Sequence, residues 1–119
     1  MAKSARLIPP LTVAAMALER RRCPRFPANA AVRSHLSVTE GGDIWPERIR
    51  NISAGGISLL VDRPIAPGTM MTLDLYHIMR RLYCRRRLRV VSSIESEGGF
   101  IIGGPFDGEL WLDELQGLT

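Results

Sequence analysis

Two short stretches of the chain carry side chains that could bind a planar anion. One is the arginine-rich segment Glu19-Arg-Arg-Arg-Cys-Pro-Arg25, and the other is the polar turn Asn51-Ile-Ser-Ala-Gly-Gly56. Guanidinium groups grip phosphate oxygens through paired hydrogen bonds, and they match the O6 and N7 edge of guanine. Asn51 and Ser53 add short-reach donors and acceptors, while Gly56 lets a flat ring approach the backbone closely. We therefore expect a binding site wherever these two stretches meet.

Each stretch alone also has a simpler interpretation. A run of arginines is usually a solvated surface, and a turn rich in Asn, Ser and Gly usually just connects two strands. Pro24 and Pro27 favour extended backbone over helix, so the arginines are expected beside the first strand rather than on a helix. The predicted ligand-binding residues from the two stretches together are Arg20, Arg21, Arg22, Arg25, Asn51, Ser53 and Gly56.

The composition points in the same direction without identifying a ligand. The chain has 119 residues, a natural size for one domain, and sixteen basic residues face twelve acidic ones. Fifteen of the basic residues are Arg and one is Lys3. Because Arg presents a planar fork that Lys lacks, the surplus favours nucleotides, nucleic acid or an acidic surface as partners.

Short strands are the elements that must hold these groups in place. Apolar residues alternate with polar ones between turn signals, which predicts strands over residues 30–38, 45–51, 57–61, 69–76, 82–94 and 99–103. A Gly-Gly pair at 41–42 and a Pro- and Gly-rich segment at 63–68 predict turns. Strands of this length, joined by tight turns, predict a small six-stranded antiparallel β-barrel.

Two helices are predicted beside the strands. Trp111, Leu115 and Leu118 recur at helical spacing, which predicts a C-terminal helix over about 109–117 with Asp107 as its N-cap. A short N-terminal helix is predicted over 12–22, and it begins in an N-terminal extension that covers residues 1–18. The barrel domain would then occupy residues 19–119.

Catalytic and metal sites are not indicated. The two cysteines, Cys23 and Cys84, have no C-x-x-C spacing, and His35 and His77 complete no ligand pattern with them. No phosphate-binding or dinucleotide-binding glycine motif occurs. The apolar run at 11–18 is shorter than a membrane span, and no signal peptide is evident. We therefore expect a cytoplasmic, reduced protein that is not an enzyme, holds no metal or cofactor and does not insert into a membrane.

The two polar stretches resemble the paired signatures of the PilZ domain, the bacterial receptor module for cyclic di-GMP. Arg21-Arg-Cys-Pro-Arg25 fits R-x-x-x-R, and Asn51-Ile-Ser-Ala-Gly-Gly56 fits D/N-x-S-x-x-G, in the family's order. Pro67-Gly68 before a strand, Leu88-Arg-Val-Val91 and Ile102-Gly-Gly-Pro-Phe106 follow the family's course toward its terminal helix. The resemblance covers roughly residues 19–118.

The resemblance implies a PilZ-like split barrel of six strands with a C-terminal helix. It implies that Arg21 and Arg25 hold the phosphates and guanine edges of cyclic di-GMP, with Arg20 or Arg22 assisting. Asn51 and Ser53 would contact a guanine, and Gly56 would allow close approach. Ligand binding would change the conformation of the arginine segment, and an unidentified protein partner would sense the change. The predicted function is thus that of a stand-alone cyclic di-GMP receptor and adaptor.

Two alternatives remain open at the level of sequence. A small basic β-barrel could bind nucleic acid through its phosphates, or a PilZ-like module could bind another protein and no nucleotide. A second basic cluster, at Arg80, Arg81, Arg85, Arg86, Arg87 and Arg89, fits either a solvated strand edge or a contact surface for a protein or nucleic acid.

Overall fold

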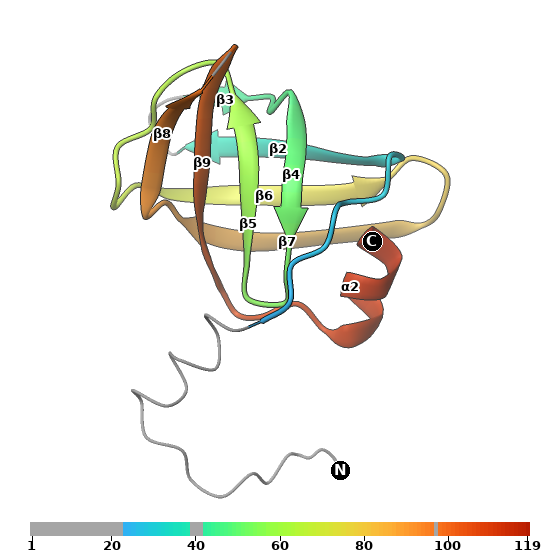
Figure 1. Ribbon diagram of the computed structural model, residues 1–119. Coiled ribbons are helices and arrows are strands. Elements are labelled where there is room, and N and C mark those ends of the chain that lie inside the picture. Colours follow the sequence, from blue (N-terminus) through green and yellow to red (C-terminus); the bar gives the residue numbers. More distant parts are fainter. Residues whose placement is uncertain (1–22, 39–41, 97) are drawn as a thin grey trace, which may run out of the picture.

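The computed structural model describes residues 23–38, 42–96 and 98–119 (Figure 1). The predicted helix over 12–22, the N-terminal extension and three of the predicted site residues, Arg20, Arg21 and Arg22, lie outside the described residues. The proposed domain boundary at residue 19 therefore stays a prediction.

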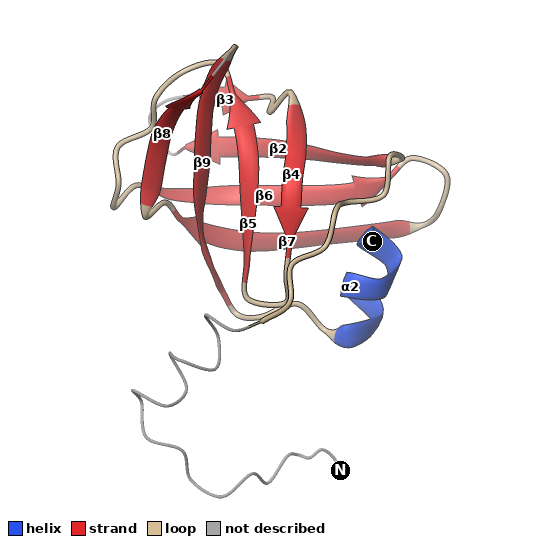
Figure 2. Cartoon of the chain, in the orientation of Figure 1, coloured by secondary structure: helices blue, strands red, loops and turns tan. Residues whose placement is uncertain are grey.

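Antiparallel strands in two crossing layers form the body of the structure (Figure 1). One layer contains β2 (Val32–Val38), β3 (Gly42–Ile44), β6 (Met70–His77) and β7 (Leu82–Arg89). The other contains β4 (Arg48–Ile52), β5 (Gly56–Val61), β8 (Ser92–Ser96) and β9 (Gly99–Asp107). The strands pair in the order β3-β2-β6-β7-β9-β5-β4, and β8 pairs with β9. With the helix α2 (Leu112–Leu118) after the last strand, the predicted mainly β fold with a C-terminal helix is confirmed (Figure 2).

Strand β9 joins the two layers because it pairs with partners in both. Over Gly99–Pro105 it pairs with β5 and β8, and at Phe106 and Asp107 it pairs with β7. Its glycines lie against other backbones at the crossing. A Cβ on Gly104 would lie 1.8 Å from the carbonyl oxygen of Arg89, and one on Gly56 would lie 2.6 Å from the carbonyl oxygen of Gly104. The crossing therefore needs glycine at both positions.

The described residues contain eight strands rather than the six predicted. The predicted strand over 82–94 is two strands, β7 and β8, because the chain changes partner between them. The Val90 amide donates to the Thr69 carbonyl, and the Val91 amide donates to the Gly103 carbonyl. The predicted turn near residue 42 contains the short strand β3, which pairs with the end of β2. The last strand also runs past its predicted end at Gly103, since Pro105 pairs with β5 and Phe106 and Asp107 pair with β7.

The core lies between the two layers. On β5 the side chains of Ile57, Leu59 and Val61 are fully buried, as the predicted alternation requires. On β7, Cys84 and Leu88 point inward, and burial raises the pKa of the Cys84 thiol to about 11. The largest fully buried side chains are Leu36, Ile52, Ile57, Leu59, Met71, Leu73, Leu75, Leu88, Ile102 and Leu118.

The C-terminal helix starts later than predicted and packs on β6 and β7. Its N-cap is Trp111 rather than Asp107, and the Glu114 carboxylate accepts a hydrogen bond from the Trp111 amide. Because Trp111 has extended backbone, its side chain lies off the helix face and is 73% exposed. Leu118 is buried as predicted, and Leu110 takes the inward place expected of Trp111. An ion pair between Glu114 and Arg86 of β7 fixes the helix on the sheet.

A buried acid, Asp74, anchors polar side chains on the outer face of β6. It accepts hydrogen bonds from the Arg85 Nε at 2.7 Å and from the Tyr83 hydroxyl at 2.6 Å, and His35 lies 3.5 Å away. The Arg85 guanidinium in particular holds the pKa of Asp74 below its usual value, against the opposing effect of burial. Asp74 therefore stays ionised at neutral pH and fixes three neighbouring side chains.

Replacing Gly104 with Ala is expected to destabilise the crossing of the two layers. The added methyl group meets the backbone oxygen of Arg89, which cannot move aside without shifting β7, so we expect a loss of about 2–3 kcal/mol. Gly103→Ala is the control, because a Cβ there would lie 3.2 Å from the nearest atom, Ile57 O. Urea unfolding of both variants measures the difference, and equal losses would contradict the proposed role of the crossing.

Acid should weaken the contribution of Asp74 to folding. Its folded-state pKa is lowered, so the stabilisation is complete above the unfolded pKa of about 4 and is lost as the pH falls through the folded value. The difference in unfolding free energy between the wild type and Asp74→Asn should therefore shrink as the pH decreases below about 4. Asp62→Asn, which removes an exposed partner of Arg63, should show a much weaker pH dependence. A difference that stays constant with pH for Asp74→Asn would contradict the assignment.

Candidate functional site

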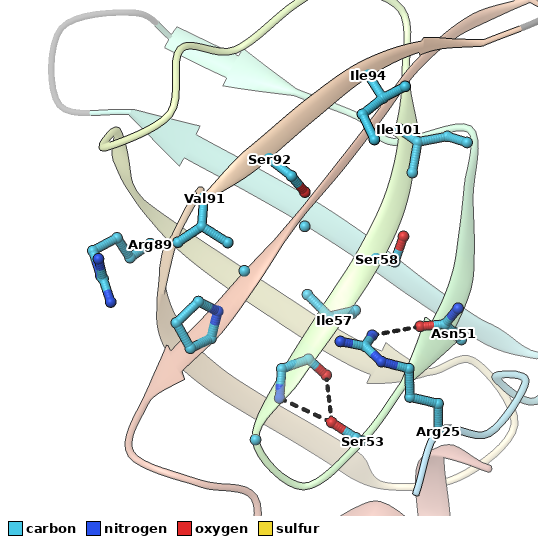
Figure 3. A pocket seen from close by; sticks show the side chains of 15 residues that line it. Arg25, Asn51, Ser53, Ile57, Ser58, Arg89, Val91, Ser92, Ile94 and Ile101 are labelled. Carbon is cyan, nitrogen blue, oxygen red and sulfur yellow. Dashed lines mark hydrogen bonds between the residues drawn. The ribbon is translucent and has the colours of Figure 1, made fainter. Parts of the chain in front are cut away.

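An N-terminal arm, residues 23–27, runs beside the end of β4. The backbones of Phe26 and Ile52 exchange two hydrogen bonds of 2.8 Å, which place the arm next to the turn between β4 and β5. Arg25 Nη1 then donates to the Asn51 Oδ1 at 2.7 Å (Figure 3). The two polar stretches picked out in the sequence therefore meet in space at Arg25 and Asn51.

The turn after β4 is held by its own hydrogen bonds. The Ser53 amide donates to the Gly56 carbonyl at 2.9 Å, and the Ser53 Oγ accepts from the Gly56 amide at 3.2 Å (Figure 3). The carbonyls of Ala54 and Gly55 accept from the Leu110 and Phe106 amides. Ser53 is only 3% exposed, so its hydroxyl shapes the turn. The turn is consequently fixed both internally and to the end of β9.

A cleft of about 670 Å³ opens beside this turn, on the outer side of β5, β8 and β9 (Figure 3). This volume lies within the range of small-molecule sites. Because Gly103 and Gly104 carry no side chains, the middle of the cleft is flat backbone. Val91, just before β8, is 50% exposed and Ile94 on β8 is 62% exposed, and the two give one wall an apolar surface. The lining residues are Arg25, Asn51, Ser53, Gly55, Gly56, Ile57, Ser58, Arg89, Val91, Ser92, Ile94, Ile101, Gly103, Gly104 and Pro105.

All charged residues among those that line the cleft are arginines, so the charge of the lining is positive. Arg25 comes from the arm and Arg89 from the end of β7, and no carboxylate is among the residues that line the space. The Arg25 guanidinium uses one N–H on Asn51 and has further donors to offer. A flat, partly apolar cleft with two guanidinium groups suits a planar anion.

Four of the predicted site residues, Arg25, Asn51, Ser53 and Gly56, line this cleft. From the sequence, Arg89 was assigned only to the second basic cluster, because no local feature of the sequence distinguishes it from the neighbouring arginines. The apolar side chains of Val91, Ile94 and Ile101 and the glycines of β9 were not predicted as part of a site. The Gly103-Gly104 pair at the end of a predicted strand was a usable signal, since such glycines often mark close approach of a backbone or a ligand.

Other kinds of site are not seen in the part of the chain that the structure describes. No group of three or more His, Cys, Asp or Glu side chains there is placed to hold a metal ion. Within the same residues, no helix has the length and apolar character needed to cross a bilayer.

Comparison with known proteins agrees with this geometry. The family model described as "PilZ domain" matches residues 19–108. The structure is similar to that of the Bacillus subtilis inhibitor of motility, MotI/DgrA, with a TM-score of 0.60 and 17% sequence identity. The match covers 82% of this chain and 47% of that one, so this chain spans about half the length of the solved protein. No curated protein matches the sequence.

Ser53→Ala should destabilise the turn while leaving the surface of the cleft nearly unchanged. The substitution leaves the buried Gly56 amide without its side-chain acceptor, which we expect to cost about 1–2 kcal/mol. Ser58→Ala on β5 is the matched control, because Ser58 also lines the cleft and its hydroxyl has no such role in the turn. Thermal and urea unfolding measure both, and an unchanged Ser53→Ala would contradict the role assigned to the hydroxyl.

Proposed function

The chain belongs to the PilZ domain family, a family of cyclic di-GMP receptors, and from this premise we propose that it binds cyclic di-GMP in the cleft beside Arg25. PilZ receptor domains are non-catalytic binding modules, in agreement with the expectation that this protein is not an enzyme. The observation that carries the proposal is the contact between Arg25 and Asn51. It joins the two family signatures at the edge of one positively charged cleft.

The chemistry of the cleft suits each part of the proposed ligand. Cyclic di-GMP carries two phosphates and two guanines, and Arg25 and Arg89 can each hold a phosphate or the O6 and N7 edge of guanine. The Asn51 amide can both donate to and accept from a guanine edge. The flat backbone at Gly103 and Gly104 leaves room for a base, and Ile94 can cover its apolar face. The ligand therefore meets donors at its edges and carbon at its faces.

The arm supplies the proposed response to the ligand. Its preceding residues Arg20, Arg21 and Arg22 are proposed to close on the phosphates, while the Phe26–Ile52 bridge keeps the arm beside the turn. A ligand that contacts both the arm and the turn favours the closed arrangement, because only differential binding can shift such an equilibrium. A partner protein would then sense the ordered arm. We place this activity in the cytoplasm, as expected of a second-messenger receptor.

Arg25→Ala is expected to weaken cyclic di-GMP binding about tenfold or more. A hydrogen bond to a charged group contributes about 1.5–3 kcal/mol, and each 1.4 kcal/mol is a factor of ten in affinity. The double variant Arg21→Ala/Arg25→Ala should abolish binding and leave the fold intact. Arg48→Ala is the matched control, because Arg48 is an exposed arginine on β4 that does not line this cleft. Isothermal titration calorimetry measures all four proteins, with GTP as the competing nucleotide.

The outcomes separate the receptor from its two rivals. Normal affinity in the double variant would show that the site is assigned to the wrong residues. Absence of heat and of a thermal shift in the wild type would refute the receptor and leave a PilZ-like protein-interaction module. Binding that shows no preference over GTP and falls steeply with salt would indicate a general polyanion binder, such as a nucleic-acid protein.

A further inference from the structure

Strand β7 carries a row of charged and aromatic side chains on its outer face. Tyr83, Arg85, Arg87 and Arg89 are exposed, while Cys84 and Leu88 between them are buried. Successive outward residues on a strand are about 6.8 Å apart, so the three arginines form a straight row about 14 Å long. The sequence showed these arginines only as a cluster. Because they alternate with inward-pointing residues along one strand, their side chains form an ordered row on one face.

Most of the positive charge on this face is not neutralised within the described residues. Arg85 is held by Asp74 through two hydrogen bonds, from Nε to Oδ1 and from Nη2 to Oδ2. No ion pair joins Arg87 or Arg89 to a carboxylate in the described part of the chain, and the same holds for Arg80 and Arg81 at the β6–β7 turn. The face therefore presents four arginine charges to solvent.

Apolar side chains lie at the other end of the same hairpin. Tyr83 is 58% exposed, and Ile78 and Met79 in the turn before β7 are 54% and 78% exposed. Exposed Met, Tyr and Arg together are typical of protein interfaces. The phenol of Tyr83 is also fixed by its hydrogen bond to Asp74, so this ring is pre-positioned.

A protein partner fits this face better than a nucleic acid does. Asp107 lies opposite Arg87 in the β7–β9 register, and Asp74 lies opposite Arg85 on β6, so carboxylates interrupt the path that a phosphate backbone would follow. The exposed side chains of Ile78 and Met79, next to Arg80 and Arg81 in the turn, add apolar surface that a phosphate backbone cannot use. A segment with carboxylates at one end and apolar side chains at the other would complement both parts of the face.

We propose that the outer face of the β6–β7 hairpin, from Ile78 to Arg89, is a docking surface for an acidic, amphipathic segment of a partner protein. Carboxylates of the partner pair with Arg87 and Arg89, and its apolar side chains cover Met79 and Tyr83. Fixed complementary charge steers the encounter and sets the register, while the apolar end supplies buried area. This surface differs from the cleft, although the two meet at one residue.

Arg89 belongs to both surfaces, since it ends the row on β7 and lines the cleft. An anion bound in the cleft would neutralise the same guanidinium that a partner carboxylate needs. Nucleotide and partner should therefore weaken each other's binding, and by linkage the factor is the same in both directions. This coupling, unlike the docking surface itself, rests on the proposed binding of cyclic di-GMP.

The test is binding of a fluorescent peptide of about fifteen residues that repeats Glu-Glu-Leu, measured by fluorescence anisotropy at low salt. Arg87→Gln/Arg89→Gln should weaken binding about tenfold, since it removes both guanidinium groups with which the carboxylates of the peptide would pair. Arg48→Gln/Arg50→Gln on β4 is the matched control, because it removes the same charge from exposed positions in the other layer. It should change affinity less than about twofold. Met79→Ser tests the apolar end, where weaker binding is expected at unchanged charge.

Three results would overturn the docking surface. The first is that the wild type does not bind the peptide, and the second is that the two double variants lose equal affinity. The third is that an oligothymidine of equal charge binds more tightly than the peptide and does so through Arg87 and Arg89. The last would make the face a nucleic-acid site. Thermal unfolding of every variant confirms that the fold is retained, and the single variant Arg87→Gln replaces the double variant if that one fails to fold.

A second titration, with saturating cyclic di-GMP present, separates the docking surface from the coupling. Weaker peptide binding with the nucleotide supports shared use of Arg89. If the nucleotide binds and leaves the affinity for the peptide unchanged, the coupling is wrong. If the nucleotide does not bind at all, the proposed receptor function fails, and the docking surface is judged by the arginine variants alone.

Discussion

The close approach of backbones where β9 crosses between the two layers is the constraint on which the rest of the structure depends. Gly104 lies against the carbonyl of Arg89, and Gly56 lies against Gly104, so three segments pack there without intervening side chains. The crossing lets β9 pair with β7 at one end and with β5 and β8 along the rest. It also leaves flat backbone in the middle of the cleft. One steric requirement thus produces both the closed core and the open cleft.

Two guanidinium groups reach the cleft from elements that are far apart in the sequence. Arg25 is held by a short backbone bridge and by Asn51, whereas Arg89 is the last residue of the regular strand β7 and pairs with Met70 of β6. Arg25 is therefore positioned by a few contacts, and Arg89 by the strand pairing of its whole layer. This difference suits a site in which one side stays rigid while the other side adjusts to what is bound.

Local patterns in the sequence predicted the fold class and some of the residues that line the candidate site, and contacts between distant segments account for the rest. Strand β5 was predicted because its alternation matches burial on one face, and Asn51 and Gly56 were recognised through a motif that spans one turn. The break between β7 and β8 could not be read locally, because Val90 and Val91 continue an apolar run and only their partners change. Trp111 matched a helical period, but the helix begins one residue later. Arg89, at the end of β7, lines the cleft because β9 crosses directly beside it. No local spacing in the sequence predicts that crossing.

The tether of the arm has a kinetic consequence. The two Phe26–Ile52 backbone hydrogen bonds and the Arg25–Asn51 side-chain hydrogen bond join the arm to β4, and the Phe26 side chain is partly exposed. Detaching the arm is thus a local opening that leaves the core intact, so it needs far less free energy than global unfolding. Opening of the arm would then be fast, and association would be governed by diffusional encounter. The lifetime of a bound state, and so the duration of any signal, would be set by the dissociation rate constant.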